Sequence, residues 1–242
     1  MPVSNPKDVV ERRTGGTPRL SVRAADRESA AAAIENGADA VCVGNLGTLE
    51  MAHTMTSLPI QADFSMNICN HGSLEFLKEY GVKMATASFE LPPAELQAML
   101  QKASIPVEVV IHGAYASMLC DHNIPAFSLS PDPFADTAFS DRRYALLDEA
   151  GERHSIRIDQ YGRNHILFAK DLCLYPYLEA LDGVASYRIE GQDYTPQWVG
   201  RLAAFYRKAL DAVVMGASGM PTIDEIASDG PRKPGIGAFR FY

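Results

Sequence analysis

Strand-like and helix-like segments alternate along this 242-residue chain, in units of about 20 residues. Ala40–Gly44, for example, is typical of a short buried strand, and the segment TLEMAHTM that follows is typical of a helix. Such regular alternation predicts parallel strands joined by right-handed crossovers. We expect about six strands of this kind, at residues 19–23, 40–44, 60–67, 84–90, 107–112 and 185–190.

One face of these strands is polar. Strands covered by helices on both sides are apolar on both faces, and polar side chains buried there are costly. We therefore predict an α/β fold of the (β/α) TIM-like barrel type, with function inside it and at the C-terminal strand ends. Six strands are fewer than the eight of a closed barrel, so a partial or open barrel is expected. The polar positions are Arg19, Ser21, Arg23, Gln61, Asp63, Ser65, Asn67, Thr86, Ser88, Glu90, Glu108, His112, Ser186, Arg188 and Glu190.

The alternation is interrupted once, which sets the predicted domain organisation. Residues 1–17 are expected to be a flexible leader, and residues 18–216 a single barrel-like domain. Two alternating segments around Glu149–Glu152 predict an antiparallel hairpin insertion at about residues 143–169. Residues 217–242, rich in glycine and proline, are expected to form an extended tail.

Charge and hydropathy exclude several classes of protein. The net charge of −8 does not predict a broad basic surface for nucleic acid. No run of about 18 apolar residues predicts a membrane span, and the polar N-terminus does not resemble an export signal. We therefore expect a cytoplasmic protein.

The segment PVEVVIHGAYASMLCDHN, residues 106–123, carries most of the candidate chemistry. Glu108 and His112 share one strand face and could act as acid–base groups toward a substrate. The alternative is that hydrogen bonds hold them and so fix the following loop. For Arg188 and Glu190, which share the polar face of the last strand, an internal salt bridge and an anion site are both open.

Cysteines in this segment and beyond it suggest metal chemistry. Cys120, His122 and Cys173 could bind a metal ion or an incomplete cluster, because thiolate and imidazole suit zinc or iron. The alternative is that each cysteine is a buried thiol and that His122 is a surface loop residue. The four cysteines show no CxxC pair.

Common catalytic and nucleotide-binding motifs are missing from the sequence. GxGxxG and GxxxxGK[ST] do not occur, so nothing predicts a Rossmann or P-loop site. GxSxG and HExxH are absent as well, so serine-hydrolase and zincin proteolysis lack their usual residues.

Four segments together resemble the peptidase U32 family, the collagenase-like proteins. They are VEVVIHGA, the hairpin YALLDEAGERHSIRIDQYGRNHILFAKDLC, the strand and helix GVASYRIEGQDYTPQWVGRLAAFYRKALD, and QADFSMNICNHGSLEFLKEYGVKMATASFEL. The resemblance covers roughly residues 36–213 and implies a barrel fold. Val110 stands where the family pattern has phenylalanine.

The resemblance also implies a cofactor, because several family members bind a [4Fe–4S] cluster through four cysteines. Cys173, in Asp-Leu-Cys, matches the last of these ligands. The two cysteines expected after His-Gly-Ala fall on Ala116 and Asn123, and Cys120 lies three residues before Asn123. The remaining cysteine is absent between Ser128 and Arg143. The implied cofactor is an iron–sulfur cluster or a single metal ion.

Three functions follow from the resemblance. The first is oxygen-independent hydroxylation of an aromatic substrate, either a quinone precursor or an RNA base. The second is a collagenase-like peptidase acting on protein. The third is a non-catalytic family member that scaffolds a related partner subunit or forms a homo-oligomer. In the hydroxylation scheme Glu108, His112, Arg188 and Glu190 contact the substrate, and Cys120 and Cys173 lie near any metal.

Overall fold

The computed structural model describes the backbone of residues 21–23 and, beyond it, residues 40–122, 124, 144–159, 161–181, 183–215, 219–227 and 230–237. The predicted leader and Arg19 lie outside these ranges, and Arg23 is described by its backbone alone. No helix within the described ranges is both long enough and apolar enough to cross a membrane.

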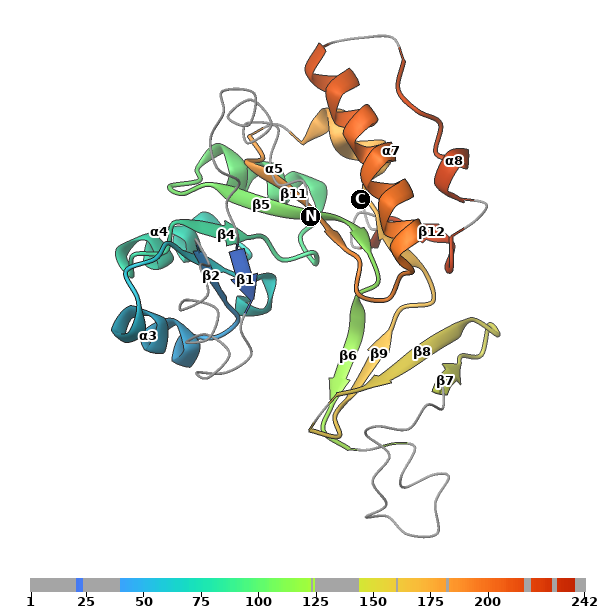
Figure 1. The fold of residues 1–242 in the computed structure, drawn as a ribbon, viewed down its shortest axis with the longest axis horizontal. Coiled ribbons are helices and arrows are strands. Elements are labelled where there is room, and N and C mark those ends of the chain that lie inside the picture. The colour runs from blue at the N-terminus through green and yellow to red at the C-terminus, as the bar shows by residue number, and fades with distance from the viewer. Residues whose placement is uncertain are drawn as a thin grey trace.

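Six strands of the main sheet are parallel and run in chain order, as the alternation predicts (Figure 1). Neighbouring strands follow one another in the chain, and α-helices connect β2 to β3, β3 to β4 and β4 to β5. This confirms the α/β class and the parallel strands. These six strands are β1 (Ser21–Arg23), β2 (Ala40–Val43), β3 (Ile60–Ala62), β4 (Met84–Thr86), β5 (Val107–Gly113) and β11 (Ser186–Glu190).

Strand β5 is the centre of the sheet, and every one of its residues is buried. Strand β11 pairs along one edge of β5, from Glu108 to Gly113. The other edge is shared by β4, which pairs with the start of β5, and by β10 (Asp171–Cys173), which pairs antiparallel with its end. Within the described residues β1 does not pair with β11, so the sheet is open and a closed barrel is not formed there.

The helices between the strands supply the apolar core. The core includes Leu49, Leu74, Leu96 and Leu202, one nearly fully buried leucine from each of four helices. These helices are α3 (Leu46–Met55), α4 (His71–Glu79), α5 (Pro93–Gln101) and α7 (Pro196–Met215).

Local sequence explains where these helices begin. Asn45 and Thr48 form a capping box at the start of α3, and Asn70 accepts a hydrogen bond from the backbone N–H of Ser73 at the start of α4. Pro93 occupies the first turn of α5, where proline is favoured.

A second, antiparallel sheet extends away from the helices (Figure 1). Its strand order is β6-β9-β8-β7. Strands β7 (Tyr144–Leu147) and β8 (Arg153–Ile158) form the predicted hairpin, and β9 (Asn164–Leu167) is its third strand.

The fourth strand of this small sheet, β6 (Ala116–Cys120), corrects a prediction. The sequence predicts that the chain turns at Gly113 and enters a short loop carrying Cys120, Asp121, His122 and Asn123. Residues 116–120 instead form a strand that pairs with β9, and Cys120 is its last residue. The partner lies more than forty positions along the chain, with Ser117 Oγ donating to the Ile166 carbonyl 49 residues away. A strand that depends on such a distant partner carries little local signal.

The chain after the small sheet also differs from expectation. The segment DLCLYPYLEAL, residues 171–181, is typical of a helix in sequence. In the structure Asp171–Cys173 is strand β10, and only Tyr175–Ala180 is helical, as the 3₁₀-helix η2. The C-terminal region contains α8 (Asp224–Ala227) and the short strand β12 (Pro234–Gly235), which pairs with β10. Strand β12, within the predicted extended tail, therefore belongs to the main sheet.

Gly113 allows β5 and β11 to approach closely at their ends. Its φ is +145°, and an added Cβ would lie 2.5 Å from Cβ and 2.6 Å from the carbonyl oxygen of Glu190. We expect Gly113→Ala to lower the free energy of unfolding by roughly 3 kcal/mol, through backbone strain and overpacking. Chemical denaturation measures this value.

Gly151 provides the matched control. It has a φ of +78°, but an added Cβ there meets nothing within 4 Å. Gly151→Ala should therefore lose only about 1 kcal/mol, from the left-handed backbone alone. Equal losses for the two variants would contradict the proposed close contact between β5 and β11.

Candidate functional site

A row of polar side chains crosses three strands of the main sheet. Thr86 of β4 is in register with Glu108 of β5, which is in register with Ser186 of β11. Residues in register on parallel strands point to the same face, so these three side chains meet. All three are buried, as the predicted polar face requires.

Glu108 accepts a hydrogen bond from each neighbouring strand. Its Oε1 lies 3.0 Å from Thr86 Oγ1 and 3.1 Å from Gln61 Nε2. Its Oε2 lies 3.0 Å from Ser186 Oγ, and Arg188 Nη1 approaches Oε1 at 3.5 Å. Four donors match the lone-pair capacity of a carboxylate. This arrangement holds Glu108 in place and suits a residue that positions Arg188.

Arg188 is the centre of the charged part of the site. Its Nη1 lies 2.8 Å from Asp63 Oδ1, and its Nε and Nη2 contact Glu190 Oε1. Its Cζ lies 5.4 Å from the centroid of the Phe64 ring, within the range of a cation–π contact. Burial alone would lower the pKa of Arg188, but Glu190 and Asp63, with Glu108, raise it above its usual value.

This geometry decides between an internal salt bridge and an anion-binding site at Arg188 and Glu190. One guanidinium faces three carboxylates, so its charge is already compensated and an incoming anion would be repelled. The salt bridge is therefore what the structure shows. Because acceptor oxygens outnumber positive charges here, the site favours a ligand that donates hydrogen bonds.

Asp63 and Phe64 link the site to the loop after β3. Asp63 is fully buried, and Ser65 Oγ donates to Asp63 Oδ2 at 3.2 Å and to the Gly44 carbonyl at 3.0 Å. The chain turns here through a 3₁₀-helix, η1 (Phe64–Met66), and ends it with Asn67 in the left-handed conformation. The predicted strand 60–67 therefore stops at Ala62, and the turn brings Phe64 beside Arg188.

His112 belongs to a second, more deeply buried group. Its Nδ1 lies 3.0 Å from the hydroxyl of Tyr206, which is also 3.4 Å from the Ile111 carbonyl and 3.5 Å from Cys173 Sγ. Burial lowers the pKa of His112 to about 4, so the imidazole is neutral at pH 7. Burial likewise raises the pKa of Cys173, which disfavours the thiolate that nucleophiles and metal ligands need.

The predicted metal ligands lie apart. Cys173 pairs with His112 at the end of β5, whereas Cys120 ends β6 at the far end of the small sheet. His122 follows Cys120 and is exposed, and its carbonyl accepts a hydrogen bond from Asn164 Nδ2. Among the described residues, no group of three or more ligand residues with their atoms within 4.8 Å of one another includes any of the three.

These residues therefore do not fit a shared metal ion, and the described cysteines do not fit a four-cysteine cluster. The metal ion and the cluster are implied by the family resemblance, and the positions of the described ligand residues do not support them. We expect this chain, purified anaerobically, to hold well under one cluster, as iron and acid-labile sulfide analysis measures. About four irons and four sulfides per chain would contradict this expectation.

The sequence did not single out the aromatic side chains at the strand ends. Phe64 follows β3, Phe89 follows β4 and Tyr115 follows β5, each by two or three residues. The Phe64 and Phe89 ring centroids are 5.1 Å apart, as are those of Phe89 and Tyr115. The recurring position after each strand was the available signal, because parallel strands bring their C-terminal ends to one edge.

Most of the sequence matches one family. Residues 23–233 match the model of Peptidase family U32, and the chain belongs to this family. It is 27% identical over 192 residues to an uncharacterized protease of Methanocaldococcus jannaschii, covering 74% of this chain and 45% of that protein. No solved structure matches the chain.

A second relative has a named reaction. The chain is 28% identical over 192 residues to the 23S rRNA 5-hydroxycytidine C2501 synthase of Escherichia coli, covering 74% of this chain and 27% of that enzyme. The chain therefore spans less than half the length of either relative.

Replacement of Glu108 tests whether the polar row, formed by Thr86, Glu108 and Ser186, stabilises the fold. Glu108→Ala leaves three neutral donors and one arginine without their shared acceptor, and we expect the free energy of unfolding to fall by about 3 kcal/mol or more. Denaturant unfolding measures the loss. The exposed Glu75 of α4 is the control, and Glu75→Ala should change the value by no more than about 0.5 kcal/mol.

The lowered pKa of His112 predicts a pH dependence. Between about pH 4 and 6.5 the unfolded chain binds a proton at this imidazole and the folded chain does not, so stability falls as the pH is lowered through this range. From pH 7 to pH 5 this group should remove about 2 kcal/mol from the free energy of unfolding. His112→Gln should lack that part, whereas replacement of the exposed His53 by glutamine should retain it. Identical pH profiles for wild type and His112→Gln would contradict the assignment.

Proposed function

We propose that this chain binds the aromatic ring of a nucleobase in RNA and takes part in its oxygen-independent hydroxylation. A quinone precursor is the other aromatic substrate of this scheme. We also propose that the open parallel sheet is part of a (β/α) barrel, with the polar row on its inner face. The E. coli relative modifies an RNA base, which supports the first proposal at low identity.

The observation that carries the proposal is Arg188 beside Phe64 and the three carboxylates. A guanidinium plane and an aromatic ring both stack on planar bases, and carboxylate oxygens accept hydrogen bonds from base amino groups. Asp63 and Phe64 follow the C-terminal end of β3, and Glu190 is the last residue of β11. Glu108 is the second residue of β5, in register with Thr86 at the C-terminal end of β4. Parallel α/β folds place their reactions at the C-terminal strand ends.

Hydroxylation replaces a ring hydrogen by a hydroxyl group, which is a two-electron oxidation, so an oxygen donor and a two-electron acceptor from outside the described residues must take part. The described residues have the chemistry to bind and orient the ring. Arg188 and Phe64 would offer flat surfaces to it, and Glu190, whose Oε2 accepts a hydrogen bond from the exposed Gln192, would accept one from its edge. His112 is neutral, so it adds no charge to this face.

The peptidase alternative is less well supported by the described residues. It rests on the family name and on the printed name of the archaeal relative. A cysteine nucleophile needs a low thiol pKa and a nearby base. Cys173 is instead buried beside the Tyr206 hydroxyl with a raised pKa.

A scaffold role is the remaining alternative, with a related partner subunit or a second copy supplying the catalytic groups. The chain covers 45% or less of each relative, so a partner could provide what the rest of those proteins provide. Under this alternative Arg188 would matter for stability or assembly alone.

Arg188→Met tests the proposal in cells that lack the native chain. We expect one hydroxylated nucleoside in digests of cellular RNA to disappear in the deletion strain and to return with the wild-type chain. It should not return with Arg188→Met, because the variant loses the cation that faces Phe64 and the carboxylates. Mass spectrometry of the digests measures the modification.

The control is Arg207→Met, which removes another paired arginine, held by Asp211 on α7 away from the strand ends. This variant should restore the modified nucleoside. Unchanged RNA hydroxylation in the deletion strain would overturn an RNA substrate. Restoration by Arg188→Met would overturn the role of the site.

A further inference from the structure

We propose that four aromatic side chains, Phe64, Phe89, Tyr115 and Phe168, bind the unpaired RNA bases next to the target base. We call these four residues the aromatic row. The inference rests on the proposed function, since it takes single-stranded RNA as the substrate, and it goes further by naming the surface that holds the strand.

The aromatic row is continuous from the polar site to the small sheet. Phe64 contacts Phe89, and Phe89 contacts Tyr115, with both pairs of centroids 5.1 Å apart. Tyr115 then contacts Phe168, just after β9, at 4.6 Å, and Phe168 lies 6.4 Å from the His154 ring. The row therefore begins at Arg188 and ends on the arm formed by β6–β9.

The rings are not sealed inside the core. Phe64, Phe89 and Tyr115 are partly buried, and Phe168 is 40% exposed. Large aromatic residues next to a polar site with accessible surface are typical of stacking platforms for single-stranded nucleic acid. Such platforms tolerate any base sequence, because every base has a flat face.

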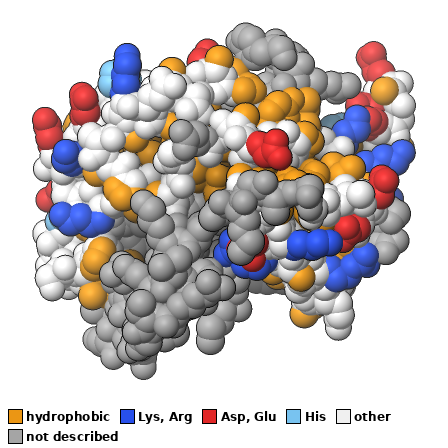
Figure 2. All heavy atoms as spheres, turned by 90° about the horizontal axis from the view of Figure 1, so that it is seen from above, with side chains coloured by type: hydrophobic (Ala, Val, Ile, Leu, Met, Phe, Trp, Pro, Cys, Tyr) orange, Lys and Arg blue, Asp and Glu red, His pale blue; other side chains and the backbone are white. Residues whose placement is uncertain are grey.

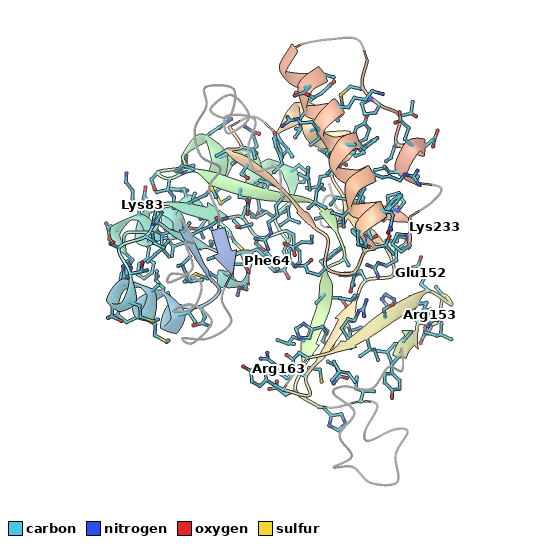
Figure 3. All side chains as sticks on the ribbon, in the orientation of Figure 1. Phe64, Lys83, Glu152, Arg153, Arg163 and Lys233 are labelled. Atoms are coloured by element: carbon cyan, nitrogen blue, oxygen red, sulfur yellow. The ribbon has the colours of Figure 1, made fainter. Side chains whose placement is uncertain are left out.

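Basic side chains lie at the outer end of the aromatic row, in a chain whose net charge is −8. Lys170 is two residues after Phe168. Its Cβ lies 3.0 Å from a Cβ built on Gly235. The exposed Lys233 is two residues before Gly235. Lys170 pairs with Glu152 at 2.9 Å, but an exposed pair of this kind is weak and yields to a phosphate. Glu152 and Arg153 lie together at one end of the small sheet (Figure 3).

Acidic and basic side chains of the described residues are interspersed on the face in Figure 2, with hydrophobic ones between them. A strand of RNA would thus be held by bases on the aromatic row and by few phosphate contacts. Single-stranded RNA should bind better than a duplex, whose bases cannot reach the rings.

Fluorescence anisotropy with a short labelled single-stranded oligoribonucleotide tests the inference on the full chain. We expect Phe168→Leu to raise the Kd at least about fivefold, because the variant keeps an apolar side chain and loses the stacking of one base. Phe168→Trp should bind at least as tightly as the wild type. The same RNA as a duplex should bind more weakly than the single strand.

Phe76→Leu is the matched control. Phe76 is 43% exposed and pairs with Tyr80 at 4.6 Å on α4, outside the aromatic row. The Phe76→Leu variant should leave the Kd for the RNA unchanged. Thermal unfolding should show that all variants are folded. Two variants at position 168 separate stacking from packing, since a packing defect would weaken binding for tryptophan and leucine alike.

Several outcomes would overturn the inference. They are no binding by the wild-type chain, equal binding of single strand and duplex, an unchanged Kd for Phe168→Leu, or equal loss in Phe76→Leu. Each leaves the proposed function open, because the analysis of nucleosides with Arg188→Met decides that separately.

Discussion

The partly buried charge of Arg188 is the constraint on which the site depends. A guanidinium removed from water must be matched by acceptors close at hand. Asp63 supplies them from the turn after β3, Glu108 from β5 and Glu190 from β11. Glu108 is in turn fixed by donors from β3, β4 and β11. Holding one cation therefore sets the relative positions of four strands, and the same arrangement forms the site.

Two neighbouring polar groups beside β5 differ in how deeply they are buried. The Arg188 group lies beside Phe64, and its guanidinium is partly open to solvent. The group of His112, Tyr206 and Cys173 is nearly fully buried, and its members resist ionisation. The first group suits ligand binding, while the second suits packing of α7 against β5. The small sheet then carries an aromatic surface away from the first group.

Sequence patterns predicted the repeating units and the polar face, because both follow from spacing along one segment. They placed Glu108 and His112 on one face of their strand, and Arg188 and Glu190 on one face of a second strand. They could not show that these strands are neighbours, since Ser186 and Glu108 are 78 residues apart. Strand β6 was missed for the same reason, as its partner β9 is distant in sequence. Cys120 and Cys173 were predicted as ligands of one metal because the sequence does not show that they lie apart in the fold.

The coupling between Glu108 and Arg188 tests most directly whether this ion-pair group organises the site. It is obtained from the free energies of unfolding of wild type, Glu108→Gln, Arg188→Met and the double variant. The structure predicts a coupling on the order of 1–3 kcal/mol, because both residues belong to one buried network. Effects that add to within about 0.5 kcal/mol would show that the two residues act independently, and would contradict the account.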